Sequence, residues 1–166
     1  MSQPYLAKDS RGITTLYVEN KPFFCLAGEI HNSSSSCAEY MEAHVWPHIA
    51  GKGLNTVLLP VAWETVEPAK GEYVFDIVDK LISQGKERGV KLIFLWFGLW
   101  KNAESFCVPA WVKKDPATYF PALQYGGIRA NSISPFCKEA VAADARAFAA
   151  LMQHLAQSDK DHTVIM

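Results

Sequence analysis

Short apolar runs near the start of the chain are separated by residues that favour turns. The runs TTLYV at 14–18 and FFCLA at 23–27 are rich in β-branched and aromatic residues. Asn20 and Pro22, which stand between them, are turn formers, so this part of the chain is predicted to be a β-hairpin. The second run continues into GEIHN at 28–32, where polar groups follow the apolar stretch.

Two longer apolar runs follow, LNTVLLPVAW at 54–63 and VKLIFLWFGLW at 90–100. They are almost unbroken, which is typical of strands buried on both faces of a parallel sheet. A helix is predicted at about 38–50, with an interruption at Pro47, and a second helix begins with Asp76 as its cap. Strands and helices therefore alternate along the chain.

The last third of the chain continues this alternation. Residues 101–134 contain several prolines and a Gly-Gly pair and are predicted to be a long loop, of the kind that usually lines a site. The alanine-rich stretch 136–156 has apolar residues at helical spacing and is predicted to be an amphipathic helix. Residues 163–166, TVIM, have the composition of a strand that is just beginning.

This order of elements predicts an α/β fold with right-handed βαβ crossovers and a parallel sheet. We interpret it as a partial TIM (β/α)₈ barrel: the first three βα units and the start of strand four, preceded by a β-hairpin. A complete barrel needs eight units and about 250 residues. Residues 1–166 are therefore expected to be the N-terminal portion of a single, incomplete barrel catalytic domain.

Composition and charge narrow the class of partner. Apolar residues make up 49% and charged residues 20% of the chain, an ordinary globular balance. The net charge of -1 offers no basic excess for phosphate binding, so nucleic acid is not expected as a partner. No signal peptide or membrane-spanning stretch is expected, which favours the cytoplasm or leaves the compartment open.

The cysteines and histidines show no metal-binding pattern. His44 and His48 have helical spacing, but Pro47 lies between them and no acidic ligand is placed nearby. The cysteines are widely separated and are interpreted as free thiols, with a disulfide left open: Cys25, Cys37, Cys107 and Cys137. Neither a metal nor a cofactor is expected.

The residues that end the three predicted strands are the candidates for a site, because barrel enzymes build their sites at the carboxyl ends of the strands. They include carboxylates, an imidazole, an amide and indoles. Such groups suit a carbohydrate, whose hydroxyls need hydrogen-bond partners and whose C–H faces stack on aromatic rings. The candidate substrate-binding residues are Glu29, His31, Trp63, Glu64, Trp100 and Asn102.

Structural interpretations of several of these residues stay open. Glu29 either faces a polar cavity or makes an internal ion pair, because an unpaired buried carboxylate is costly. His31 is also consistent with a structural group at a strand end. Trp96 and Trp100 are each as consistent with core packing as with a sugar platform. Glu67 is interpreted as shaping its loop rather than as a catalytic group.

Three stretches, taken in order, carry motifs of a known family. They are KPFFCLAGEIHNSS, GKGLNTVLLPVAWETVEPAKGEYVFD, and RGVKLIFLWFGLW followed by VPAWV. The first resembles the opening strand of the β-galactosidases of glycoside hydrolase family 35 and the related family 42, with its G-[ES]-I-H core. The second resembles their second strand with its EP-x-x-G-x-Y-x-F loop, and the third resembles their third strand.

The resemblance implies a retaining hydrolase of β-galactosides, in which two glutamates at the ends of strands four and seven do the chemistry. The acid/base glutamate of the family belongs to an Asn-Glu pair a few residues beyond a strand start like TVIM, and the nucleophile lies much further on. The resemblance therefore implies that neither catalytic carboxylate lies within 1–166, that this chain alone is inactive, and that only the sugar-binding side of the site matches.

Two other classes of function stay open. The chain is alternatively a non-catalytic sugar-binding half-barrel that associates with another copy through its open sheet edges. It is also consistent with a barrel hydrolase that acts on a different β-linked glycan.

Overall fold

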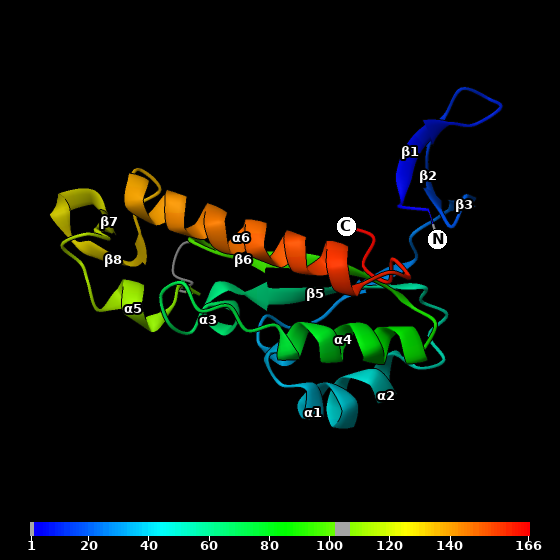
Figure 1. Ribbon diagram of the computed structural model, residues 1–166, viewed down its shortest axis with the longest axis horizontal. Coiled ribbons are helices and arrows are strands. Elements are labelled where there is room, and N and C mark those ends of the chain that lie inside the picture. Colours follow the sequence, from blue (N-terminus) through cyan, green and yellow to red (C-terminus); the bar gives the residue numbers. More distant parts are fainter. Residues whose placement is uncertain (1, 102–106) are drawn as a thin grey trace.

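The computed structural model describes residues 2–101 and 107–166, which form three small sheets and the helices around them (Figure 1). The N-terminal sheet is antiparallel, with the bounds β1 (Tyr5–Lys8), β2 (Thr14–Val18) and β3 (Lys21–Phe23). The predicted hairpin is confirmed as β2–β3, and its turn places Glu19 and Asn20 at positive φ angles of 53° and 61°. β1 was not predicted; it pairs with β2, and the rings of Tyr5 and Tyr17 stack across the pair with centroids 5.2 Å apart.

The central sheet is parallel, as the long apolar runs predict. Its strands are β4 (Ala27–Glu29), β5 (Thr56–Ala62) and β6 (Lys91–Phe97), in that order. The chain returns to this sheet at residues 163–166, which lie beside β6 in the same direction (Figure 1). There the Leu92 N–H donates to the Thr163 carbonyl (2.8 Å), and the Ile165 N–H donates to the Leu92 carbonyl (2.9 Å). The strand start predicted at 163–166 is therefore in place along β6.

Asn55 joins the N-terminal part of the chain to the parallel sheet. Its side-chain N–H donates to the Phe24 carbonyl (2.8 Å), and its side-chain oxygen accepts the Leu26 N–H (2.9 Å). An amide side chain can satisfy backbone groups in this way because it offers a donor and an acceptor. The approach to β4 is thereby fixed before the strand begins.

Pro60 stands in the middle of β5, where a residue without an N–H is normally disfavoured. β4 ends at Glu29, two positions short of pairing with Pro60, and its last bond to β5 runs from the Ile30 N–H to the Leu58 carbonyl (3.1 Å). The Pro60 carbonyl instead accepts the hydroxyl of Ser35 (2.5 Å), which is buried. Pro60 is tolerated because the neighbouring strand has already ended.

The helices cover one face of the parallel sheet. The longer ones are α4 (Asp76–Glu87) and α6 (Lys138–Ser158), as the sequence pattern predicts. The main core packs side chains from β5, such as Leu59, against Trp46, Leu81 and Leu151 from three different helical segments. Burying large apolar side chains of this kind contributes about 1.5–3 kcal/mol each. One detail of the prediction is wrong: Phe75 occupies the cap position of α4, and Asp76 lies in its first turn, where a carboxylate favours the positive end of the helix dipole.

The predicted interruption at Pro47 is confirmed. The helical segment after β4 consists of a short 3₁₀ turn and three consecutive pieces: η1 (Ser34–Ser36), α1 (Ala38–Tyr40), the π-helical η2 (Met41–Val45) and α2 (Trp46–Ile49). Pro47 lies in the first turn of α2, where its missing N–H has no partner to lose. A π-helical piece directly before it accommodates the change in hydrogen bonding.

The segment predicted as a loop at 101–134 contains more structure than expected. Its described residues form α5 (Ala110–Lys113), β7 (Pro121–Leu123), η3 (Tyr125–Gly127) and β8 (Arg129–Ile133). A further short helix, α3 (Trp63–Val66), directly follows β5. β7 and β8 pair antiparallel around Gly126 and Gly127, whose φ angles of 82° and 79° suit only glycine well. The sequence pattern missed this hairpin because its strands are short and mixed in polarity. It lies at the opposite end of the molecule from β1–β3 (Figure 1).

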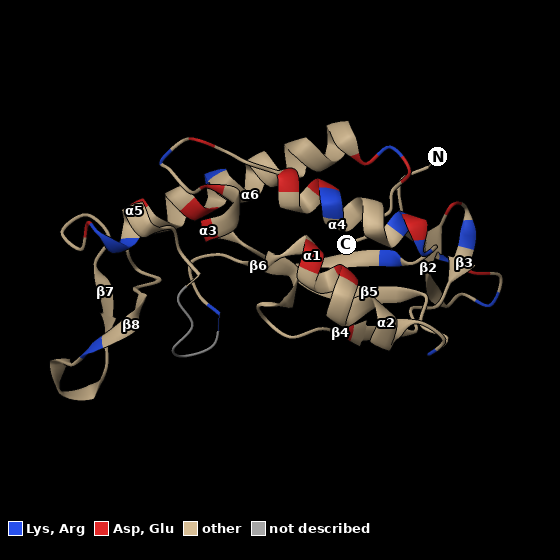
Figure 2. Ribbon diagram, turned by 90° about the horizontal axis from the view of Figure 1, so that it is seen from below, with Lys and Arg blue, Asp and Glu red and all other residues tan. Residues whose placement is uncertain are grey.

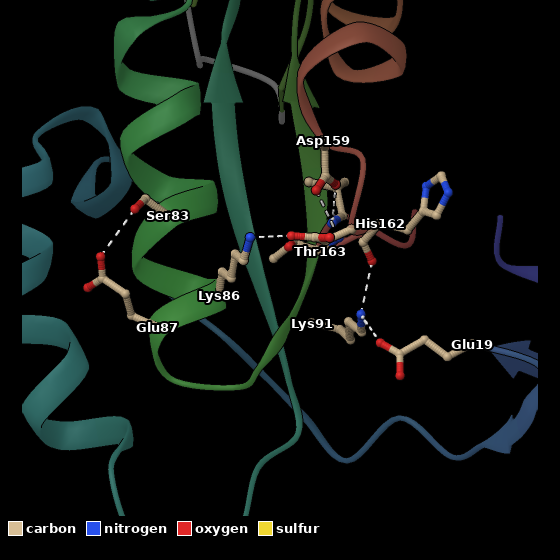
Figure 3. Close-up of polar contacts among 10 residues, drawn as sticks. Glu19, Ser83, Lys86, Glu87, Lys91, Asp159, His162 and Thr163 are labelled. Atoms are coloured by element: carbon tan, nitrogen blue, oxygen red, sulfur yellow. Dashed lines mark hydrogen bonds and ion pairs between the residues drawn. The ribbon is translucent and has the colours of Figure 1, made fainter. Parts of the chain in front are cut away.

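A polar network ties the last residues of the chain to the amino end of β6 (Figure 3). The carboxylate of Asp159, which is buried, accepts the N–H groups of Thr163 (3.0 Å) and Val164 (2.8 Å). Lys86 pairs with Asp161, and the Lys91 ammonium donates to Glu19 (2.9 Å). The turn before residues 163–166 is thus held by side chains from α4, β6 and the N-terminal sheet.

Candidate functional site

The face of the parallel sheet opposite the helices carries the first candidate residue. Glu29 pairs in register with Leu58, which pairs with Ile93, so these three side chains share one face. The neighbouring positions Val57 and Leu92 pack into the core beneath the helices, which identifies the Glu29 face as the one without helices. Figure 2 shows the charged residues mainly on helices and loops, with few on β5 and β6.

Glu29 is exposed on this face. Within residues 2–101 and 107–166 no ion pair of Glu29 is seen, so the internal ion pair is not present there, while the interpretation that Glu29 faces a polar cavity stays a prediction. Its neighbours Leu58 and Ile93 are partly exposed. The carboxylate therefore stands beside apolar side chains, in an arrangement that can accept hydroxyl groups of a ligand while the apolar surface contacts its carbon skeleton.

His31 lies two residues beyond the end of β4 and is exposed. Its backbone is fixed, because its carbonyl accepts the Ser34 N–H (3.1 Å) and the hydroxyl of Ser35 is bonded to Pro60 in β5. The imidazole therefore projects from a short connection that is anchored to the sheet. The structure leaves both ring nitrogens of His31 available in the part of the chain that it describes.

Trp63 is placed differently from the other candidates. It is 0% exposed, and its indole N–H donates to the carboxylate of Glu67 (2.7 Å). Its ring packs edge to face against Trp111, with centroids 5.8 Å apart. Trp63 thus braces the end of β5 and has no surface open to a ligand in this conformation, contrary to the expectation that it lines a site.

Glu67 confirms its predicted part in shaping the loop. Its carboxylate is 4% exposed and accepts both the Trp63 indole and the Gly71 N–H (2.8 Å), while its backbone carbonyl accepts the Trp111 indole (3.1 Å). Gly71 has a φ of 80°, so the turn that brings its N–H to Glu67 requires a glycine. All of these bonds are internal and the residue is buried, so the Glu67 carboxylate is not open to a ligand.

Glu64 is exposed and is held by α5. Its carboxylate lies 3.0 Å from the ammonium of Lys113, and its N–H donates to the Cys107 carbonyl (3.0 Å). Burial raises the pKa of the Cys107 thiol, and the nearby carboxylate of Glu64 raises it further. The thiol is therefore kept in its neutral form, which argues against a nucleophilic role.

The two tryptophans of the third strand have different positions. Trp96 is directed to the helix layer: its indole N–H donates to Asp144 on α6 (2.6 Å), and its ring lies 5.8 Å from that of Phe148. Trp100 is 52% exposed. Core packing is therefore the role of Trp96, whereas about half of the surface of Trp100 is accessible. Asn102 lies outside the residues that the structure describes.

The register shows how the strand ends are arranged. β5 and β6 end level with each other at the pair Ala62 and Phe97, so Glu64 and Trp100 leave the sheet at the same edge. The last pair of β4 is Glu29 with Leu58. Leu58 lies four residues before Ala62, so Glu29 is about 13 Å from the carboxyl edge of β5. Glu64 and Trp100 thus belong to the carboxyl edge, and Glu29 belongs to the open face below it.

Sequence reasoning missed Asp144. It lies in the alanine-rich stretch that was predicted to be an ordinary amphipathic helix, yet its carboxylate accepts two bonds from the end of β6. The signal in the sequence is a single acidic residue among Ala143, Ala147 and Leu151, on the face that packs inward. A carboxylate on the buried face of a helix needs partners, so the exception in the pattern marks a bonded position.

Among the described residues, no group of three or more His, Cys, Asp or Glu side chains is arranged to hold a metal ion. In the same part of the chain, none of the helices has the length and apolar character needed to cross a membrane. The four cysteines are free thiols.

Comparison with known proteins gives relatives among enzymes that act on glycosides. The chain is 31% identical over 127 residues to β-galactosidase 14 of Arabidopsis thaliana, a match that covers 68% of this chain and 13% of that protein. No protein-family model matches the chain.

Solved structures with a similar fold include endo-glycoceramidase II from Rhodococcus sp. in complex with ganglioside GM3 (TM-score 0.55, 21% identity, covering 98% of this chain and 41% of that one). Another is the exo-β-1,4-mannosidase of Opitutaceae bacterium strain TAV5 (TM-score 0.52, 19% identity, covering 90% and 24%). The chain spans less than half the length of each of these proteins. It is therefore glycosidase-like in sequence and has the α/β fold of these glycoside hydrolases over the residues that it shares with them.

Proposed function

We propose that residues 1–166 form the N-terminal portion of a (β/α)₈-barrel catalytic domain of a retaining, β-galactosidase-like glycoside hydrolase. In this proposal the chain supplies three βα units, and residues 163–166 begin the fourth strand. The observation that carries the proposal is the parallel sheet β4-β5-β6: among the described residues, α2, α4 and α6 pack on one face, while the other face holds an exposed carboxylate. One helix-covered face and one inward face are what a barrel requires of each strand.

The sugar-binding side of the site is assigned to residues of this open face and edge. Glu29 and Glu64 accept hydroxyl groups, His31 donates or accepts one, and the exposed indole of Trp100 stacks on the C–H face of a pyranose. Asn102 is included from the sequence alone. Trp63 does not contact the sugar; its bond to Glu67 supports the backbone that carries Glu64.

No residue of this chain is assigned a catalytic role. A retaining mechanism uses two carboxyl groups about 5–5.5 Å apart, one as acid/base and one as nucleophile. Glu64 is paired with Lys113, and Glu29 stands on a different level of the sheet. In this proposal both catalytic glutamates lie outside residues 1–166. The proposed substrate is a β-galactoside, as the resemblance implies.

The test combines turnover and binding on the 166-residue chain. We expect no hydrolysis of an aryl β-galactoside but saturable binding of galactose, followed by tryptophan fluorescence or calorimetry. Glu29→Gln should weaken this binding about tenfold, since a hydrogen bond to a charged group is worth about 1.5–3 kcal/mol. Glu87→Gln, on the exposed side of α4, is the matched control and should bind as the wild type does.

Two results would contradict the proposal. Hydrolysis by the wild-type chain would show that the catalytic carboxylates lie within it. Absence of saturable binding for galactose and for a panel of other β-linked sugars would remove the sugar site altogether, whereas binding of another sugar alone would change the substrate class.

A second candidate is a non-catalytic, sugar-binding half-barrel that pairs with another copy. The observation in its favour is that the parallel sheet has two outer strands, β4 and residues 163–166, and a face with partly exposed Leu58, Ile93 and Leu95. Parallel sheets are normally covered on both faces. A stable dimer that binds galactose without any turnover in longer forms of the chain would favour this candidate over the first.

A further inference from the structure

The end of β6 is held by one carboxylate from a distant helix. Asp144 on α6 accepts the indole N–H of Trp96 through one oxygen (2.6 Å) and the backbone N–H of Leu99 through the other (2.8 Å). Both donors are partly buried, and hydrogen bonds to a carboxylate are about twice as strong as bonds between neutral groups. The carboxylate therefore fixes two points of the chain that are three residues apart.

Gly98 lies between these two points and leaves no room for a side chain. A Cβ atom at this position would stand 2.3 Å from one oxygen of Asp144 and 2.4 Å from the indole nitrogen of Trp96. Both are closer than real Cβ contacts allow. A side chain here would displace the Asp144 carboxylate or the Trp96 indole from their present bond, so Gly98 and Asp144 form one unit.

The residues that follow are directed by this unit. Leu99 is 7% exposed and packs into a second core cluster with Val108 and Val112. Since both its N–H and its side chain are held, the backbone direction at the next residue is fixed as well. That residue is Trp100, which is 52% exposed. The neighbouring ammonium of Lys101 lies over the ring of Phe97, 4.4 Å from its centroid, and restricts the chain on the far side.

We propose that Asp144 is a positioning residue that fixes the indole of Trp100 as the stacking platform for the sugar. Asp144 itself does not touch the sugar; it acts through Leu99 and Gly98. The inference rests on the proposed function for the identity of the ligand, but the positioning of Trp100 is measurable without any ligand. A stacking platform benefits from such support, because a ring held in place before binding loses less conformational freedom when the ligand arrives.

The variant Asp144→Asn separates positioning from simple packing. Asparagine has the same shape and still accepts one bond, but its NH₂ group faces a donor where the carboxylate offered a second acceptor. Gly98→Ala disrupts the same unit from the other side, because its Cβ atom overlaps the Asp144 carboxylate and the Trp96 indole nitrogen and forces them to move. Glu139→Gln removes one negative charge from the same helix at an exposed position and serves as the control.

The measurements are amide hydrogen exchange at Leu99 and the NMR signals of the tryptophan indoles, with Trp100 assigned through Trp100→Phe. In Asp144→Asn and Gly98→Ala we expect exchange at Leu99 to rise about tenfold or more, which corresponds to the loss of about one strong hydrogen bond. The Trp100 signal should shift and broaden. Galactose binding should weaken about tenfold, while Glu139→Gln leaves all three quantities unchanged.

The outcomes distinguish the inference from the proposed function. If Leu99 exchange and the Trp100 signal stay as in the wild type in a folded Asp144→Asn protein, the inference is overturned; if that variant fails to fold, the same result in Gly98→Ala decides. If the variants release Trp100 but the wild-type chain binds no sugar, the positioning role stands and the proposed function fails. If Trp100 is released and sugar binding is unchanged, Trp100 is not the platform and the inference is overturned.

Discussion

At the scale of single residues, the polar side chains of this protein that look most like functional groups divide into two kinds. Glu67, Asp144 and Asp159 are at least partly buried, and each accepts two N–H groups from its own surroundings. Glu29 and His31 are exposed and have no such role in the described chain. Burial with paired donors marks a carboxylate that stabilises the fold, whereas exposure next to apolar surface marks one that can meet a ligand.

Glu67 provides a prediction at this scale. Glu67→Ala removes the acceptor of two buried donors, the Trp63 indole and the Gly71 N–H, so we expect the free energy of unfolding to fall by about 2–4 kcal/mol. Glu67→Gln keeps one acceptor and should lose about half as much. Urea denaturation followed by fluorescence measures the change, and Glu72→Gln at an exposed position is the control. An unfolding free energy in Glu67→Ala equal to that of the wild type would show that the loop does not depend on this carboxylate.

At the scale of elements, the parallel strands were the most accurately predicted parts, and the segment after β6 was the least. The continuous apolar runs of β5 and β6 predicted parallel strands, which the register confirms, and residues 163–166 took their predicted place along β6. Burial on both faces, which such runs also predict, is seen only on the helix side, since Leu58, Ile93 and Leu95 are partly exposed. The hairpin β7–β8 escaped prediction because it depends on local turn geometry at Gly126 and Gly127 rather than on a run of apolar residues. Short strands of mixed polarity carry little periodic signal.

The join between α4 and the turn at 159–163 provides a pH-dependent prediction (Figure 3). The bond from Lys86, together with its charge, lowers the pKa of Asp161 below its ordinary value of 3.8, and the bond to Asp161 raises the pKa of Lys86 above 10.5. Because the pKa of Asp161 is lower in the folded state, its contribution to stability is present above pH 3.8 and is lost as the pH falls through the lowered value. The contribution of Lys86 is lost only as the pH rises through its raised pKa, above 10.5.

Asp161→Asn tests this join. We expect it to lower the urea midpoint slightly at pH 7, because the pair is exposed and screened by solvent, and to have no effect well below the lowered pKa of Asp161. High salt should reduce the difference at pH 7 as well. Ser158→Ala, an exposed change near the same turn, is the comparison protein. A difference between wild type and Asp161→Asn that is independent of pH would assign the effect to packing instead of charge.

At the scale of the whole molecule, the helices and the parallel sheet form two layers, and none of the described helices covers the other face of the sheet. Leu58, Ile93 and Leu95 are partly exposed on that face, and both outer strands of the sheet offer unpaired backbone groups. Whichever polypeptide covers this face, the apolar surface favours association when it is left open.

The corresponding prediction concerns the chain in solution. Sedimentation velocity of the 166-residue chain should show association that increases with concentration, and Ile93→Lys should shift it toward the monomer by placing a charge on the open face. Val74→Lys changes an exposed apolar residue elsewhere and should associate as the wild type does. A wild-type chain that stays monomeric at all concentrations would contradict this prediction. A single, stable dimer would favour the half-barrel candidate, and heterogeneous larger species would favour the barrel portion.

The sequence alone determined the order of the parallel strands and of the longer helices, the parallel direction of the central sheet and the set of strand-end residues, because these elements depend on runs and helical repeats of apolar side chains. The tertiary structure decided which of those residues are open to a ligand. Trp63 and Trp100 both follow a buried strand, yet one is enclosed by Trp111 and Glu67 and the other stands exposed. Their difference, like the bond between Asp144 and Leu99 across 45 residues, depends on partners that are distant in sequence and meet only when the layers pack.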